Sequence, residues 1–228
     1  MMRLINSTHY GFPEKIELDD VVDKELISLM TKTTMDPEDF YLTGYETISF
    51  KRTREFALET VISSVIPFDK DILIIANNSD DLHIQKLCNL YGVSNSLVNL
   101  PESEDELEAV ISAYNQQHIY SHILISCDVN TPECKERIRK LANELSKTSI
   151  KLIVHCRRSP MELNEVSELN IAFMVSNGMS SFISSVVIAR RSQLVQTEGI
   201  SRSERLDLYN YWQKTLYRRK PGIKPMAI

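Results

Sequence analysis

The chain has 228 residues, of which 43% are hydrophobic and 25% charged, and its formal net charge is -5 at pH 7. These values are typical of a globular protein with one sizeable core. The negative charge disfavours non-specific binding to nucleic acid or anionic lipid. No apolar run reaches the roughly 18 residues of a membrane span, and the N-terminus MMRLINSTHY lacks the apolar core of a signal peptide. We therefore expect a cytoplasmic protein with no nucleic-acid or membrane partner.

The first fifty residues contain few clear signals. Helical spacing of apolar residues runs from Asp19 to Thr33, and Tyr45 to Phe50 has the composition of an edge strand. The last residues are polar and contain prolines, which favours a tail. We divide the chain into an N-terminal helical segment (1–44), a main domain (45–216) and a tail (217–228).

From residue 53 onward, short β-branched runs alternate with longer amphipathic segments, which predicts a parallel sheet covered by helices. The near-continuous Ile, Leu and Val of these runs indicates strands buried on both faces. The predicted strands are Asp71 to Ala76, Ser96 to Leu100, Ser121 to Ser126, Lys151 to His155, Ile171 to Ser176 and Ser185 to Ala189.

The intervening helices carry start and stop signals. These signals are Thr53 ahead of REFALETVISSVI, Gly92 after a helix, Ser103 with Glu106 as a capping box, and Thr131 followed by Pro132. The segment between Ile171 to Ser176 and Ser185 to Ala189 is too short for a crossover helix, so we expect these two strands to be antiparallel. The predicted fold is α/β, with a mixed, mostly parallel sheet.

Four cysteines, Cys88, Cys127, Cys134 and Cys156, show neither paired C-x-x-C spacing nor the pattern of a disulfide framework. We expect reduced, buried thiols. Cys127 with Asp128, and His155 with Cys156, end neighbouring predicted strands, so a zinc site is conceivable, but it would need three or four convergent ligands. The prediction is therefore that the chain binds no metal.

Several segments resemble the class V pyridoxal-phosphate-dependent aminotransferases, and among them the 2-aminoethylphosphonate aminotransferases. The segments that carry the likeness are SHILIS, KLIVHCRRS, IAFMVSNGMSSF, VVIARRSQL and SRSERLDLYNYW, which keep the family's order. The likeness is specific in its last third and only topological in its first third. It extends upstream to TISFKRTREFALETVISSVIPFDKDILII and covers roughly residues 45 to 215. The resemblance implies the large-domain fold, a missing small C-terminal domain and a homodimer.

The resemblance also implies a catalytic lysine, and in this chain that position falls on Ser180. No lysine occurs between Lys151 and Lys214, and serine cannot form the Schiff base that holds the cofactor. The acid that would pair with the cofactor's ring nitrogen falls on His155. A neutral imidazole is a poor counter-ion, and a protonated one would repel a pyridinium.

Two further parts of the implied site are changed. The family's glycine- and serine-rich phosphate loop corresponds to Arg52-Thr53-Arg54-Glu55, and its stacking aromatic residue corresponds to Asp80. Bulky side chains and the Glu55 charge oppose phosphate at a helix N-terminus. We regard Thr53, Arg54, Asp80, His155 and Ser180 as vestigial site positions and predict no catalytic residue and no cofactor.

The resulting hypothesis is an aminotransferase-like protein that has lost catalysis and binds a small anion or a partner protein. Arg157 and Arg158, with Arg52 and Arg54, are the residues that would hold a phosphate or phosphonate. The rival hypothesis is an active pyridoxal-phosphate-dependent transaminase of 2-aminoethylphosphonate or an amino acid. Its lysine would have to come from elsewhere, for example from Lys51, Lys70 or a partner chain. A serine nucleophile at Ser180 or Ser181 lacks an activating histidine and acid in the sequence pattern.

Overall fold

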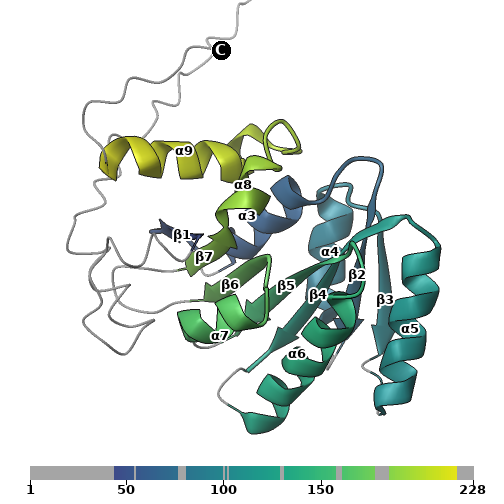
Figure 1. The fold of residues 1–228 in the computed structure, drawn as a ribbon. Helices are drawn as coiled ribbons and strands as arrows, with labels where there is room; N and C mark the ends of the chain where they lie inside the picture. Colours follow the sequence, from purple (N-terminus) through teal and green to yellow (C-terminus); the bar gives the residue numbers. More distant parts are fainter. Residues whose placement is uncertain are drawn as a thin grey trace, which may run out of the picture.

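The computed structural model describes residues 44–53, 55–76, 81–99, 101, 103–128, 131–157, 161–177 and 185–219. Over these residues the chain forms one mixed β-sheet with helices on both faces (Figure 1). This arrangement confirms the predicted fold class. The helix expected over Asp19 to Thr33 lies outside the described residues.

The elements alternate between strand and helix along most of the chain (Figure 1). The strands are β1 (Tyr45–Phe50), β2 (Asp71–Ala76), β3 (Asn95–Asn99), β4 (Tyr120–Cys127), β5 (Lys151–Cys156), β6 (Phe173–Asn177) and β7 (Ser185–Arg190). The helices are α3 (Phe56–Val65), α4 (Asp81–Leu90), α5 (Glu104–Gln116), α6 (Pro132–Leu145), α7 (Leu163–Glu168), α8 (Arg191–Val195), the 3-10 turn η1 (Glu204–Leu206) and α9 (Leu208–Arg219).

The sheet of the described residues has the strand order β1-β7-β6-β5-β4-β2-β3. Strands β2 to β6 pair in parallel, whereas β7 is antiparallel to both β6 and β1. The antiparallel reversal between β6 and β7 was predicted from the short connection, and the edge position of β1 was predicted from its composition. Both are confirmed.

The strand boundaries agree with the sequence pattern to within one or two residues. Strand β2 matches the prediction at both ends, whereas β3 begins at Asn95 and ends at Asn99, one residue earlier than expected. Strand ends are set by hydrogen bonds to a neighbour: Ile72 pairs with Asn95, which fixes where β3 begins. The propensity of a residue does not report that pairing.

The helix signals were correct at three of the four positions. The Ser103 hydroxyl accepts a hydrogen bond from the Glu106 N–H (3.2 Å) at the start of α5. The Thr131 hydroxyl accepts one from the Cys134 N–H (3.3 Å), with Pro132 as the first residue of α6. Gly92 follows α4 with a φ of 65°, in the left-handed region where glycine carries no steric cost.

The predicted start of α3 at Thr53 was wrong. The helix begins at Phe56, and Glu55 occupies the N-cap position without a capping hydrogen bond from its side chain. The Thr53 carbonyl oxygen instead accepts a hydrogen bond from the Phe56 N–H (3.1 Å), which forms a turn ahead of the helix. The Glu55 side chain is used elsewhere, as described below.

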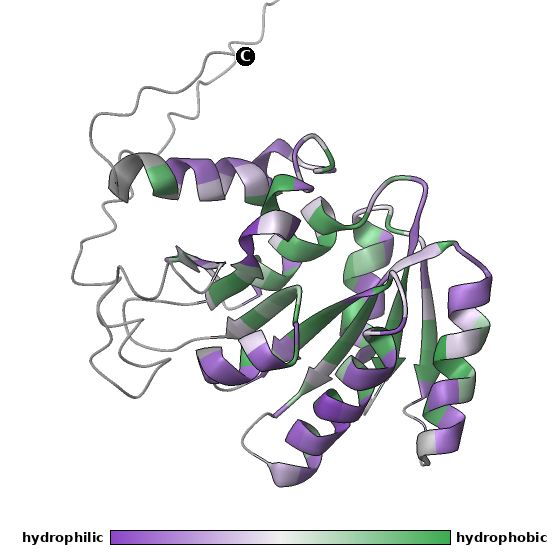
Figure 2. Cartoon of the chain, viewed as in Figure 1, coloured by the Kyte–Doolittle hydropathy of each residue, from purple (hydrophilic) through white to green (hydrophobic). Residues whose placement is uncertain are grey.

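Two apolar clusters cover the two faces of the sheet. Successive side chains of β2 belong to different clusters. Ile72 and Ile74 pack in the cluster with α3, α4 and α9, whereas Leu73 and Ile75 pack in the cluster with α5, α6 and α7. Figure 2 shows the strands as mostly hydrophobic and the outer faces of the helices as hydrophilic. The prediction of strands buried on both faces is confirmed, and none of the helices in the described part of the chain is long and apolar enough to cross a membrane.

Helix α9 packs on α3 and closes one face of the sheet (Figure 1). Leu208 and Trp212 are buried in the same cluster as α3. The Leu208 N–H donates to the buried Ser64 hydroxyl (3.0 Å), which in turn donates to the Leu206 carbonyl oxygen. The helix continues to Arg219, so the predicted boundary between residues 216 and 217 falls inside it.

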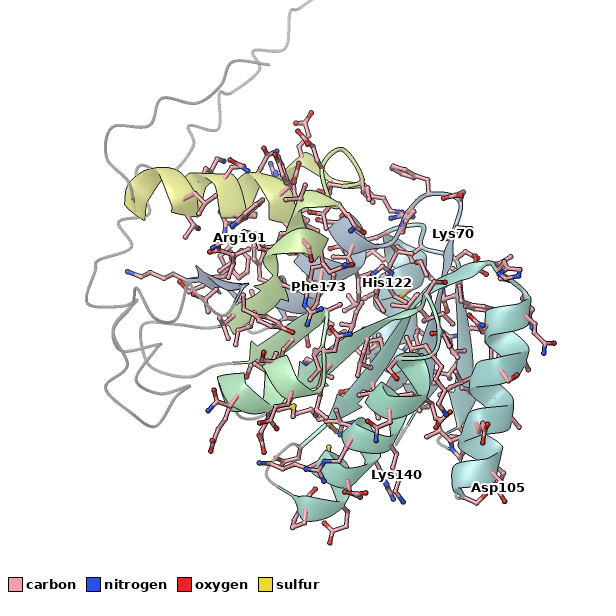
Figure 3. All side chains as sticks on the ribbon, viewed as in Figure 1. Lys70, Asp105, His122, Lys140, Phe173 and Arg191 are labelled. Atoms are coloured by element: carbon pink, nitrogen blue, oxygen red, sulfur yellow. The ribbon has the colours of Figure 1, made fainter. Side chains whose placement is uncertain are left out.

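His122 lies on β4 and is 6% exposed, with its ring 6.2 Å from that of Phe173 (Figure 3). Burial, with a smaller effect of the Lys151 charge, lowers the pKa of His122 from 6.5 to about 3. Between these two values the unfolded chain binds a proton that the native chain does not bind, so stability falls as the pH falls.

We predict that His122→Gln flattens the dependence of the unfolding free energy on pH between pH 6 and pH 4. The wild-type slope should exceed the variant's slope by about 1.4 kcal/mol per pH unit, the value for one proton. Urea unfolding at several pH values measures both slopes. His118→Asn, on an exposed loop, serves as the control and should leave the slope unchanged; equal slopes in wild type and His122→Gln would contradict the prediction.

Candidate functional site

The candidate site lies where β4 and β5 end. These strands are parallel and adjacent, and their register places Ser126 beside His155 and Cys127 beside Cys156. In open α/β sheets, ligands bind outside the carboxyl ends of the strands. The predicted position of His155 at such an end is therefore confirmed, and the tertiary structure adds Ser126 as its neighbour.

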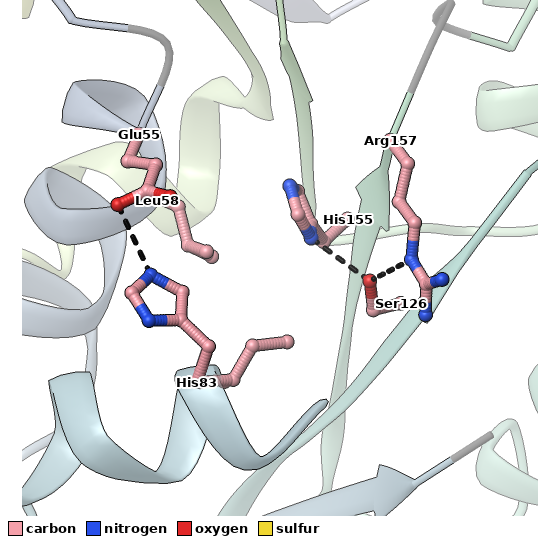
Figure 4. Close-up of a pocket in the computed structure, with 7 residues that line it drawn as sticks. Glu55, Leu58, His83, Ser126, His155 and Arg157 are labelled. Carbon is pink, nitrogen blue, oxygen red and sulfur yellow. Dashed lines mark hydrogen bonds and ion pairs between the residues drawn. The ribbon is translucent and has the colours of Figure 1, made fainter. Parts of the chain in front are cut away.

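The Ser126 hydroxyl is hydrogen-bonded both to His155 and to Arg157 (Figure 4). The Ser126 Oγ lies 2.9 Å from the His155 Nδ1. The Arg157 Nε donates to the same Oγ at 3.1 Å. Because a guanidinium can only donate, the serine oxygen is an acceptor toward Arg157, and its own proton remains available for the His155 ring.

Arg157 is further fixed by a buried carboxylate. Its guanidinium lies 3.1 Å from Asp81 Oδ1, and the Asp81 side chain is 1% exposed whereas that of Arg157 is 25% exposed. The Arg157 backbone N–H also donates to the Cys127 carbonyl oxygen at 3.0 Å. Arg157 was predicted to hold an anion; in the structure its charge is partly compensated by Asp81.

Helices α3 and α4 meet at a second charged contact, on the opposite wall of the site. Glu55 Oε2 lies 3.0 Å from His83 Nε2, and both side chains are about half exposed. The Glu55 carboxylate thus reaches across to α4 instead of capping its own helix. A negative charge remains near the N-terminus of α3, where helix dipole and free N–H groups favour anions.

Together these residues line a pocket with a volume of about 370 Å³. In Figure 4, Glu55 and His83 lie on one side of the pocket and face His155, Ser126 and Arg157 on the other. Leu58 and Ile84 add apolar surface between them. The pocket therefore combines one apolar wall with two sets of polar groups, an arrangement typical of sites for small molecules.

The other predicted site residues are only partly brought together. Thr53 is exposed and does not line the pocket, and the Arg52 guanidinium lies over the Phe56 ring at 5.0 Å. Lys70, one rival candidate for the catalytic lysine, donates instead to the His118 carbonyl oxygen (3.0 Å). Arg54, Asp80, Arg158, Ser180 and Ser181 lie outside the described residues.

Four pocket residues were not predicted from the sequence: Leu58, His83, Ile84 and Ser126. For Ser126 a signal was present in the sequence. It ends the predicted strand SHILIS, and the carboxyl ends of neighbouring parallel strands lie at the same end of the sheet. His83 and Ile84 carried no such signal, since they face the pocket only through the placement of α4 against the sheet.

The four cysteines are free thiols and all are buried, as expected. Cys127, Cys134 and Cys156 belong to the cluster on the α6 side, and Cys88 to the cluster on the α4 side. Among the described residues, no group of three or more His, Cys, Asp or Glu side chains is arranged to hold a metal ion.

Comparisons with known proteins identify sequence relatives among transaminases. No family model matches the chain. The chain is 26% identical over 202 residues to a 2-aminoethylphosphonate–pyruvate transaminase of Bacteroides fragilis, covering 83% of this chain and 52% of the relative. It is 28% identical over 210 residues to a transaminase of the same name from Bacillus cytotoxicus, covering 86% and 53%. The chain therefore spans about half the length of these curated relatives.

Solved structures of aminotransferases share the fold. Ureidoglycine–glyoxylate aminotransferase from Bacillus subtilis superposes with a TM-score of 0.58 over 90% of this chain and 55% of its own, at 12% identity. Pyridoxamine–pyruvate aminotransferase from Mesorhizobium loti superposes with a TM-score of 0.58, covering 89% of this chain and 52% of the other, at 11% identity. At this identity the likeness concerns the fold alone, and it agrees with the predicted large-domain architecture.

The prediction that the chain has no cofactor is contradicted by these comparisons. Its relatives and structural neighbours are aminotransferases, a class that works with pyridoxal phosphate, so they point to that cofactor. The residues of the described pocket are suited to non-covalent binding of this cofactor, because Leu58 and Ile84 offer apolar surface and His155 and Arg157 offer polar groups. The pocket lining in the described part of the chain contains no lysine.

The sequence motifs, the sheet order and the similarity to curated transaminases all agree. The chain is thus similar in sequence to curated 2-aminoethylphosphonate–pyruvate transaminases and shares the fold of solved aminotransferase structures.

Proposed function

We propose that the chain is an aminotransferase-like protein that binds pyridoxal phosphate, or a small anion of similar chemistry, without performing transamination. The observation that supports this proposal best is the pocket of Figure 4. It lies at the strand ends where this fold class binds its ligands, and its lining offers histidine and arginine but no lysine among the described residues.

The ring end of the ligand would lie near His155. The Nδ1 of this residue is held by Ser126, so Nε2 is the nitrogen on the other side of the ring. A neutral imidazole with its proton on Nε2 would offer an N–H group to a ring nitrogen, whereas an acid would offer a negative charge. Bound pyridoxal phosphate supplies an electron sink that depends on a protonated ring nitrogen. His155 would therefore bind the ring without supporting that chemistry.

The anionic end of the ligand would lie between Arg157 and the N-terminus of α3. Arg157 contributes a positive charge that Asp81 partly compensates. The Glu55 carboxylate opposes an anion at this end of the pocket, although it is also held by its contact with His83. We therefore propose that binding is weak.

Loss of catalysis is proposed from the missing lysine. No lysine occurs between Lys151 and Lys214, and by register with the family motifs the expected position is Ser180. Lys51 is exposed beyond the end of β1, and Lys70 is bound to the loop before β4. Neither residue lines the described pocket.

Similarity to transaminases over more than four fifths of the chain keeps an active transaminase of 2-aminoethylphosphonate or an amino acid as the second candidate. Its lysine would have to come from a part of the chain outside the described residues or from a partner chain. Reduction of the cofactor complex with borohydride distinguishes the two candidates, because only an active enzyme would attach the cofactor covalently to one lysine.

We predict that purified protein binds pyridoxal phosphate reversibly and keeps no cofactor after borohydride reduction and denaturation. Absorbance titration at 330 to 430 nm monitors binding, and mass spectrometry of the reduced protein measures attachment. Surface lysines are controlled for with bovine serum albumin under the same conditions. One stoichiometrically labelled lysine would contradict the loss of catalysis, and no binding at all would contradict the binding proposal.

We predict that Arg157→Met weakens binding of pyridoxal phosphate about tenfold, because it removes a charged donor worth about 1.4 kcal/mol. Isothermal titration calorimetry measures the affinity. Arg139→Met, an exposed arginine paired with Glu136 on α6, is the matched control and should bind as the wild type does.

The single variant removes the Arg157 charge from beside the buried Asp81 carboxylate, which can destabilise the fold. The double variant Asp81→Asn/Arg157→Met removes both charges and is measured in parallel, with circular dichroism to confirm folding. Wild-type affinity in the folded double variant would exclude Arg157 from the binding site.

We also propose a homodimer, on the ground of the family resemblance alone. Size-exclusion chromatography with light scattering should give twice the chain mass at micromolar concentration. A single-chain mass over the whole concentration range would contradict it.

A further inference from the structure

A continuous series of hydrogen bonds connects a buried carboxylate at the start of α4 to the His155 ring in the pocket. The Arg157 Nη2 donates to Asp81 Oδ1 at 3.1 Å, and the Arg157 Nε donates to Ser126 Oγ at 3.1 Å. Ser126 Oγ lies 2.9 Å from His155 Nδ1 (Figure 4). Asp81, Ser126 and His155 are 1%, 2% and 7% exposed, respectively. The start of α4 and the ends of β4 and β5 therefore meet in one buried polar network.

The direction of the last hydrogen bond in this network follows from the chemistry of its members. A guanidinium has only donors, so the Ser126 oxygen is an acceptor toward Arg157. Within the described part of the chain, the partners of the Ser126 hydroxyl are the Arg157 guanidinium and the His155 ring. If His155 Nδ1 carried a proton and donated it to Ser126, the serine proton would be buried without an acceptor, which folded proteins avoid. Ser126 therefore donates its proton to His155 Nδ1.

A serine that donates to Nδ1 fixes the tautomer of His155. Nδ1 is then the acceptor nitrogen of a neutral imidazole, and the ring proton is on Nε2. The His155 ring lines the pocket together with Ser126 and Arg157. A ligand that reaches Nε2 thus meets a neutral N–H donor, instead of an acceptor or a charge.

We infer that Ser126 and Arg157 are positioning residues that hold His155 as the neutral tautomer protonated on Nε2, and that His155 thereby selects a ligand with a hydrogen-bond acceptor at this position. The ligand class is a phosphorylated heteroaromatic molecule whose ring nitrogen is unprotonated. The tautomer follows from the hydrogen bonds of the protein alone. The selection of the ligand rests on the function proposed above, because it concerns what the pocket binds.

The second histidine of the pocket provides a comparison within the same molecule. His83 Nε2 lies 3.0 Å from Glu55 Oε2, and both side chains are about half exposed. An ionised carboxylate only accepts, so the proton in this contact is on His83 Nε2. Because His83 has no hydrogen bond to Ser126 or Arg157 in the described structure, a change at Ser126 should leave its signals unaltered.

The tautomer is measured in the folded protein without ligand. Long-range proton–nitrogen correlation spectra of protein labelled with ¹⁵N-histidine distinguish protonated from unprotonated ring nitrogens, and the spectrum of His155→Phe identifies the His155 signals. We expect the proton on Nε2 in the wild type. Ser126→Ala removes the donor to Nδ1 and should give signals from both tautomers. Ser126→Thr keeps the hydroxyl and should restore the wild-type pattern.

The selection of the ligand is measured with two probes that differ in one ring atom. Pyridoxine phosphate lacks the aldehyde, so it cannot react with lysines, and its benzene analogue has a C–H group in place of the ring nitrogen. At alkaline pH, where that nitrogen is unprotonated, calorimetry should show about tenfold weaker binding of the benzene analogue to the wild type, the effect of one lost hydrogen bond. The two probes should bind His155→Phe equally. Circular dichroism checks the folding of each variant.

The outcomes separate the two parts of the inference. A proton on His155 Nδ1 in the wild type would overturn the positioning roles, and this spectrum does not depend on the folding of any variant. A wild-type tautomer pattern in folded Ser126→Ala would overturn the role of Ser126. Equal affinity of the wild type for both probes would overturn the selection. If neither probe binds although Nε2 carries the proton, the proposed function and the selection are overturned, whereas the positioning roles are supported.

Discussion

Burial of the sheet on both faces is the constraint on which the rest of this structure depends. Because helices cover both sides of β2 to β6, polar groups are tolerated chiefly at the strand ends, where backbone pairing stops. The parallel register of β4 and β5 then decides which side chains meet there, and it places Ser126 beside His155 and Cys127 beside Cys156. This one strand pairing thus builds the sheet side of the pocket. The packing of α3 and α4 against the sheet supplies the other side.

Charge compensation determines what the pocket can hold. Asp81 is almost fully buried and stabilises Arg157, and Glu55 is matched by His83 on the opposite wall. A buried charge is retained in proteins when it is paired, so the contact with Arg157 allows the Asp81 carboxylate to lie almost fully buried beside the pocket. The fold depends on the apolar clusters rather than on these groups, so site chemistry can change while packing persists.

The pocket residues and the buried cysteines are neighbours in sequence but have separate surroundings. Ser126 and Arg157 belong to the pocket, and each is adjacent in sequence to a cysteine of the cluster, Cys127 and Cys156. The Arg157 backbone N–H donates to the Cys127 carbonyl oxygen, so the ends of β4 and β5 form one rigid edge. Ser126 and Cys127 point to opposite faces of the sheet, so the pocket and the buried cysteines lie on opposite sides of the strand ends.

The sequence by itself determined the strands, the caps at Ser103 and Thr131, and the antiparallel turn between β6 and β7, because each depends on residues close together in the chain. It also determined the family resemblance and the place of His155 at a strand end. The start of α3 and the pocket contacts were decided only by the tertiary structure. These contacts join residues 29 positions apart for Ser126 and His155, 28 for Glu55 and His83, and 76 for Asp81 and Arg157. No local pattern reports such pairs, since helix placement against the sheet brings them together.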